Sequence, residues 1–123
     1  MFTIALPTAD RARTDRFYRE QLGLEPIVDE IGDDGLAEPL QFWLGPEVTV
    51  MFIPPGGFGW VTAGRPTAAP GTSECLLSRV VDTDEEVDAM AARQGAEPER
   101  KPWGYLVNFP DPDQHLWQVI NPA

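Results

Sequence analysis

The chain has 123 residues, 42% of them hydrophobic, and its 20 acidic against 9 basic side chains give a formal net charge of −11. This length suits one compact domain, or two half-domains that share a core, and the acidic balance argues against nucleic acid as a partner, because phosphate binding needs clustered Lys and Arg. No run approaches the ~20 apolar residues of a membrane span, and the single Cys75 excludes an internal disulfide and a cysteine-rich zinc cluster. No secretory signal is visible, so we expect a cytoplasmic protein that does not bind membranes.

The first half of the chain opens with a predicted strand and a predicted helix. Residues 3–6 alternate between the two faces of a short strand, which Pro7 ends. Asp10 is a favourable N-cap for a helix whose apolar stripe includes Tyr18, and Gly23 is a typical C-terminal stop. Strand-like runs follow at residues 26–30, 40–44 and 48–53.

A connecting segment at residues 54–72 is rich in Pro, Gly, Ala and Thr. Connections longer than about 12–15 residues without secondary structure are uncommon, and usually serve as lids or linkers. Phe58 and Trp60 lie within this segment. These aromatic side chains either pin a loop to the core or form a flap over a pocket.

The second half repeats the order of the first. A strand is predicted at about residues 74–80, and Thr83 with Glu86 forms a capping box that begins a helix ending at Gly95. Further strands are predicted at residues 97–101, 105–109 and 116–120.

The two predicted helices end in related patterns, Gly23-Leu24-Glu25-Pro26 and Gly95-Ala96-Glu97-Pro98, which lie 72 residues apart. This repeat predicts an α+β fold of two tandem βαβββ units, at about residues 1–53 and 73–123, within one domain. A duplicated unit places a binding site where the two copies face each other. The negative charge serves solubility alone or attracts cationic small molecules.

The most specific local pattern is the turn that precedes the last strand, Asp111-Pro112-Asp113-Gln114-His115-Leu116-Trp117. Together with residues 10–25 and 81–89, it resembles the vicinal oxygen chelate superfamily, which includes glyoxalase I, extradiol dioxygenases and the bleomycin-binding resistance proteins. The resemblance covers nearly the whole chain. It implies that the units form a curved mixed sheet, a cup around the ligand, within one chain or across a homodimer.

The resemblance also implies a divalent metal, held by His, Glu or Gln from the first and last strands of the units. Those positions read Thr3, Met51, Leu76 and Gln118 in this chain. Divalent ions of this kind need several carboxylate, imidazole or thiolate donors, and this set offers none. His115 belongs to the turn, where we expect a structural hydrogen-bonding role. We therefore predict no metal and no cofactor.

Strand alternation predicts which side chains line the cup. The predicted lining is mostly apolar, with polar groups at Gln41, Thr49, Glu74, Ser78 and Gln118. We expect tryptophans to stack on a ligand and Glu74 to meet a cation. The candidate ligand-binding residues are Trp43, Met51, Trp60, Glu74, Trp103 and Gln118. In the alternative interpretation the cup is filled by these side chains or closed by a dimer partner.

These observations favour a metal-free small-molecule binding protein that sequesters a cationic or aromatic compound. One alternative is a glyoxalase-like lyase or isomerase that works without the usual metal, with Glu74 as an acid–base group. Another is a non-catalytic subunit with a vestigial cup. No catalytic residue is assigned, and Cys75 is expected to be a buried, inert thiol.

Overall fold

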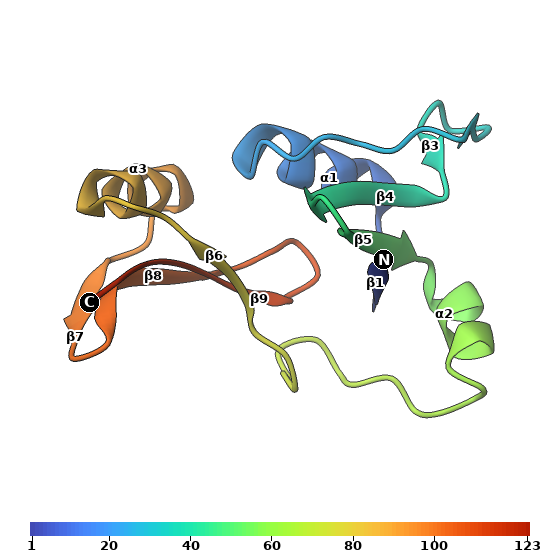
Figure 1. Cartoon of the computed structure of the whole chain (residues 1–123). Helices are drawn as coiled ribbons and strands as arrows, with labels where there is room; N and C mark the ends of the chain where they lie inside the picture. The colour runs from blue at the N-terminus through green and yellow to red at the C-terminus, as the bar shows by residue number, and fades with distance from the viewer. The chain divides into compact units, whose positions relative to one another are not determined.

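The two halves of the chain fold as two units, each built around a mixed β-sheet (Figure 1). The computed structural model describes residues 1–123, with unit 1 spanning Met1–Thr67 and unit 2 spanning Ala68–Ala123. The elements of unit 1 are β1 (Phe2–Pro7), α1 (Arg11–Arg16), the π-helical turn η1 (Phe17–Gln21), β2 (Glu30–Ile31), β3 (Ala37–Glu38), β4 (Leu40–Gly45), β5 (Val48–Ile53) and α2 (Pro55–Val61). Those of unit 2 are β6 (Leu77–Val80), α3 (Asp84–Gln94), β7 (Glu99–Lys101), β8 (Gly104–Pro110) and β9 (Leu116–Pro122). None of the helices combines the length and apolar character that a membrane span requires.

In unit 1 the last strand lies at the centre of a three-stranded sheet of order β1-β5-β4. β5 runs parallel to β1 and antiparallel to β4. A parallel pair needs a long crossover, which α1 and η1 provide. Residues on the far side of β4 continue the sheet, because Pro26 bridges Phe42 and the Ile27 N–H donates to the Gln41 carbonyl over 3.0 Å.

Three aromatic rings form the centre of the unit 1 core. Tyr18 of η1 is fully buried, and its ring centroid lies 4.4 Å from that of Phe52 and 5.6 Å from that of Phe42. Leu40 and Val50 are buried on the same face of β4 and β5. Burial of each such side chain contributes about 1.5–3 kcal/mol. The helical segment thereby covers one face of the sheet with the even-numbered residues of these strands.

The ends of the first helical segment follow the predicted signals. The Asp10 carboxylate caps α1 by accepting a hydrogen bond from the Arg13 N–H over 3.1 Å. The segment then widens into η1, and Gly23 takes the left-handed conformation, with φ of 64°. Arg11 ties α1 to the β2–β3 hairpin, because its Nε donates to Asp34 over 2.9 Å.

In unit 2 the last strand is again central, in a sheet of order β6-β9-β8-β7. β9 runs parallel to β6 and antiparallel to β8, and α3 packs on β8 and β9 (Figure 1). The predicted capping box is confirmed: Thr83 Oγ1 accepts from the Glu86 N–H, and Glu86 Oε2 accepts from the Thr83 N–H. Gly95 ends the helix in the left-handed conformation, as predicted.

Both units therefore share one topology. In each, the first strand pairs in parallel with the last, the last pairs antiparallel with the strand before it, and a helical segment joins the first strand to the rest. The sets β1, β5, β4 and β6, β9, β8 are equivalent. The predicted α+β class, with its duplicated βαβββ units and mixed sheets, is confirmed.

The segment between the units departs from the prediction in two ways. Residues 54–72 carry a short helix, α2, whose Pro55 occupies the first turn, where its missing N–H has no cost. The first strand of unit 2 begins at Leu77 instead of residue 74, since Leu77 is the first residue to pair with β9, opposite Trp117. Cys75 lies before this strand and is exposed, so the prediction of a buried thiol was wrong.

The second predicted strand of unit 1, at residues 26–30, is also shorter than expected. Only Pro26 bridges β4, while Glu30 and Ile31 turn away to pair with Ala37 and Glu38 in β3. The Gly32-Asp33-Asp34-Gly35 turn joins β2 and β3, and Arg11 forms a salt bridge with Asp34 within it.

Candidate functional site

Each unit has one candidate binding face, the sheet face that the helices of that unit leave uncovered. Successive strand residues point to opposite faces, so the register of each sheet fixes which side chains share a row across it. In unit 1, one row is Thr3, Thr49 and Trp43, and the next is Ala5, Met51 and Gln41. The predicted face of this unit is therefore confirmed.

The polar groups of the unit 1 face are largely engaged within the unit. Thr3 Oγ1 and Thr49 Oγ1 share a hydrogen bond of 3.0 Å, and Thr49 is buried. Gln41 is also buried, and its Nε2 lies 3.4 Å from Asp29 Oδ2. The accessible side chains on this face are the exposed Thr3 and Ala5 and the half-buried Met51 thioether and Trp43 indole.

The unit 2 face has a different character. The row equivalent to Ala5, Met51 and Gln41 is Ser78, Gln118 and Asn108, across β6, β9 and β8. Gln118 Nε2 donates to Ser78 Oγ over 3.1 Å, and Asn108 Nδ2 donates to the Trp117 carbonyl over 3.4 Å. The neighbouring row on the same face is apolar and consists of Val80, Ile120 and Leu106.

Three of the four positions matched to metal ligands lie on these uncovered faces, and the fourth does not. Thr3, Met51 and Gln118 keep their predicted faces. Leu76 precedes β6, and the residue in register with Gln118 is Ser78, which corrects the assignment. A hydroxyl, a thioether and a carboxamide are weak neutral donors, so these residues do not fit the divalent metal that the fold implies.

The turn before β9 is stabilised by hydrogen bonds among its own residues. Asp111 is buried, and its Oδ1 accepts from the N–H groups of Asp113 and His115 over 2.9 and 2.8 Å. The Asp111 N–H donates to the His115 carbonyl over 2.9 Å. Asp111, Asp113 and His115 also bring potential ligand atoms within 4.8 Å of one another. The carboxylate of Asp111 is nevertheless used to close the turn, and the structural role expected for the His115 side chain stays a prediction.

The other candidate ligand-binding residues lie on different elements. Trp43 and Met51 lie on the same face of unit 1, in adjacent rows. Trp60 lies on α2 with 89% of its surface exposed, and Trp103 lies in the β7–β8 turn with 60% exposed. Glu74 is exposed in the segment before β6, outside the strand where it was predicted.

Asn108 is the site residue that the sequence analysis missed. Its strand was predicted, and it stands between the buried Val107 and Phe109. A single polar residue between two apolar ones in a strand is the pattern of an uncovered face. That alternation identifies Asn108 once the pairing with Gln118 is known.

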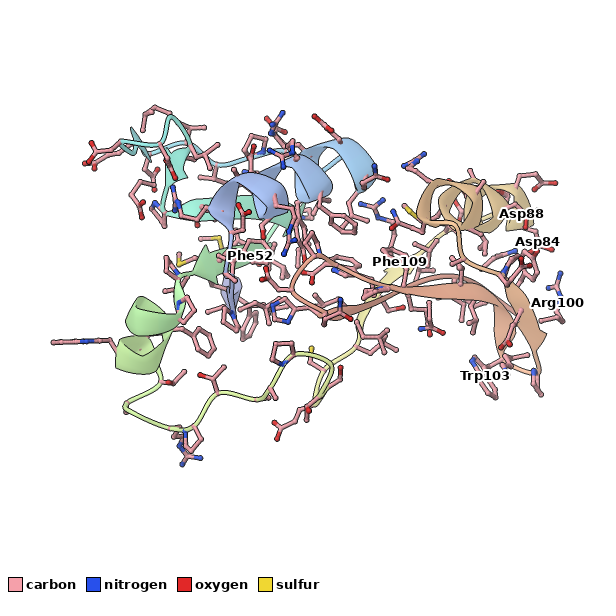
Figure 2. The ribbon with its side chains drawn as sticks, turned by 180° about the vertical axis from the view of Figure 1, so that it is seen from behind. Phe52, Asp84, Asp88, Arg100, Trp103 and Phe109 are labelled. Carbon is pink, nitrogen blue, oxygen red and sulfur yellow. The ribbon has the colours of Figure 1, made fainter.

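Charged groups gather on the opposite, helix-covered side of unit 2. Figure 2 shows Asp84 and Asp88 of α3 beside Arg100 of β7. The Asn121 amide, which donates to Asp84 over 2.8 Å, and then Arg100 lower the pKa of the Asp84 carboxyl below its usual 3.8. The hydrogen bond to Asp88 raises the pKa of Tyr105. These ion pairs and hydrogen bonds fasten α3 to the sheet and place its charge away from the uncovered face.

No family model and no curated protein matches the chain. Solved structures do match it. A glyoxalase-related enzyme from Fulvimarina pelagi has a TM-score of 0.80 at 19% identity, over 98% of this chain and 86% of that one. An antibiotic binding protein from Streptomyces sp. CB03234 has a TM-score of 0.66 at 25% identity, over 98% and 93% of the two chains. A glyoxalase/bleomycin resistance protein from the same Streptomyces strain has a TM-score of 0.62 at 25% identity, over 98% of both chains.

These matches span nearly all of the chain. The chain has the fold of the glyoxalase/bleomycin resistance protein/dioxygenase superfamily, also called the vicinal oxygen chelate superfamily.

Proposed function

We propose that the protein binds a small molecule without a metal and acts by sequestering it. The observation that carries this proposal is the chemistry of the two uncovered faces. Met51 and Gln118, at the centres of equivalent rows, offer a thioether and a carboxamide where metal-dependent members of this fold need strong donors. Sequestration requires affinity and no reacting group, so these side chains suffice for it.

The composition of the faces supports a ligand that is flat and partly apolar. Trp43 and Met51 offer an aromatic ring and a polarizable thioether in unit 1. Small-molecule sites are typically apolar surfaces with a few polar groups that fix orientation. The likeness to an antibiotic binding protein at 25% identity favours the same class of function.

A metal-free lyase or isomerase has less support. Its only proposed acid–base group, Glu74, is exposed and lies outside the strands that form the uncovered faces. A general base must reach the proton it abstracts, and the rows of both faces on β1, β4, β5, β6, β8 and β9 contain no carboxylate. The same exposure weakens the case for Glu74 as the partner of a cationic ligand.

We also propose a homodimer. Phe2, on the first strand of unit 1, is 78% exposed, and a second chain would remove such apolar surface from water. Light scattering coupled to size exclusion tests this state. Twice the mass of one chain supports the dimer, and the mass of a single chain contradicts it.

The function is tested by a thermal-shift screen of aromatic metabolites and antibiotics, run in the presence of a chelator. A hit should raise the melting temperature with increasing ligand concentration, and the ligand should be recovered chemically unchanged after long incubation. Conversion of the ligand into a product would contradict sequestration. Trp43→Ala should weaken the hit, whereas Arg65→Ala, an exposed change on the connecting segment, should not.

A further inference from the structure

On the uncovered face of unit 2, three neutral polar side chains stand side by side on three adjacent strands: Ser78, Gln118 and Asn108. We propose that this polar row binds the edge of a neutral, planar ligand that carries alternating carbonyl and N–H groups, as a cyclic imide does. The proposal rests on the function proposed above and names the class of ligand. In this proposal the polar row orients the ligand, and the apolar side chains beside it contact the ligand's ring system.

The polar row has unused hydrogen-bonding capacity. Within unit 2 the row uses only two of its donors, one from Gln118 Nε2 to Ser78 Oγ and one from Asn108 Nδ2 to the Trp117 carbonyl. The carboxamide oxygens of Gln118 and Asn108, the second N–H of each amide and the Ser78 hydroxyl remain for a ligand. Ser78 and Asn108 are exposed and Gln118 is half-buried, so these groups are accessible. Because the two carboxamides present both donors and acceptors, a ligand complementary to them also presents both.

The uncovered face of unit 2 carries few charged side chains. Although the chain carries a net charge of −11, the strands place only two charged side chains on this side of the sheet, Glu99 and Lys101 of the edge strand β7. They pair with each other over 3.0 Å. The face therefore has no net charge to attract a cation or an anion. A neutral ligand avoids the cost of removing an unpaired ion from water.

The polar row has the length of a fused-ring molecule and lies beside an apolar row. Adjacent strands lie about 4.8 Å apart, so a row across three strands spans about 10 Å, which is the length of a fused-ring molecule. Beside the polar row run Val80, which is 66% exposed, and Ile120 and Leu106, which are 8% and 4% exposed. A flat ligand whose polar edge meets the amides would lay its apolar body against Val80, at the β6 end of this second row.

The test uses lumichrome, a neutral, fluorescent, fused-ring imide, in a fluorescence titration of the full chain. The expected result is saturable binding that weakens about 5- to 10-fold in Gln118→Leu and in Asn108→Leu, the loss of one or two neutral hydrogen bonds. The di-N-methylated analogue of lumichrome, which lacks its N–H donors, should bind more weakly to the wild type. Ser73→Ala, an exposed change outside the sheet, is the matched control for Ser78→Ala and should leave lumichrome binding unchanged.

Proflavine, a cationic fused-ring molecule, is the comparison ligand for lumichrome. Gln118→Glu should weaken lumichrome and strengthen proflavine, because it places a charge in the row. Tighter binding of proflavine than of lumichrome to the wild type would overturn the proposal, while leaving the sequestering function intact if proflavine is recovered unchanged. No saturable binding of lumichrome, or equal binding by the wild type and both leucine variants, would also overturn it. Circular dichroism of each variant confirms that the comparison is made on folded protein.

Discussion

Gln118 donates a hydrogen bond from its side-chain amide to Ser78 Oγ over 3.1 Å, linking β9 to β6 on the face that α3 leaves uncovered. This contact places a carboxamide where the fold's metal-dependent members carry a strong ligand. Its partner is another neutral group instead of an ion. The chemistry of this row thus depends on Ser78, the residue of β6 that pairs with Gln118.

Replacement of Gln118 should affect binding far more than folding. Gln118→Leu removes one hydrogen bond at an accessible position, so we expect the free energy of unfolding to change by no more than about 1 kcal/mol. Urea denaturation followed by tryptophan fluorescence measures this change. A loss of several kcal/mol would mean that the side chain supports the fold, and its role in the site would then need another probe.

Tyr18 should be one of the most important residues for stability. Its ring is fully buried between Phe42 and Phe52, and truncation leaves a large cavity. We expect Tyr18→Ala to lower the free energy of unfolding by about 3–5 kcal/mol. The matched control is Trp60→Ala, which removes a larger ring that is 89% exposed and should change stability by less than about 0.5 kcal/mol. Similar losses in the two variants would contradict the core described for unit 1.

Gly104 should tolerate no side chain. Its φ is 155°, and a Cβ there would lie 2.6 Å from the Asn121 carbonyl oxygen of the paired strand. Gly104→Ala must shift β8 or β9, and we expect a loss of at least about 1–3 kcal/mol in chemical denaturation. Gly45→Ala is the control, because a Cβ at Gly45 meets nothing within 4 Å. Equal stability of the Gly104→Ala variant and the wild type would show that the turn has another conformation.

Asp84 should contribute stability that depends on pH. Its folded pKa lies below the usual 3.8, because the amide of Asn121 and then the guanidinium of Arg100 stabilise the charged form. A lowered pKa means that the contribution is present above 3.8 and is lost as the pH falls through that value toward the folded pKa. The stability difference between wild type and Asp84→Asn should therefore be largest near neutral pH and shrink in acid.

Urea unfolding of both proteins across this pH range measures the effect. Asp33→Asn, an exposed change in the β2–β3 turn, is the control and should follow the wild type at every pH. A difference between wild type and Asp84→Asn that grows as the pH falls would contradict the assignment.

The sequence predicted the elements well where local signals and alternation agree. The caps at Asp10 and Thr83 and the facing of Met51 and Gln118 could be read directly, because side-chain hydrogen bonds and strand period are local properties. The repeated Gly-x-Glu-Pro endings correctly indicated two units of one topology.

The errors arose where long-range pairing decides the structure. Glu74 and Leu76 were assigned to a strand that begins only at Leu77, because the partner residues on β9 determine where pairing starts. α2 was missed because a Pro- and Gly-rich segment has low helix propensity. The residue paired with Gln118 is therefore Ser78 and not Leu76. Asn108 belongs to the same row because it pairs with Gln118 from the other side.

We propose that the ligand binds here without a metal, and elemental analysis of protein purified without chelators tests this proposal. We expect well below one equivalent of Ni, Zn, Fe, Mn or Mg per chain, in the wild type and in Gln118→Leu alike. One tightly held equivalent that is lost in Gln118→Leu would contradict it.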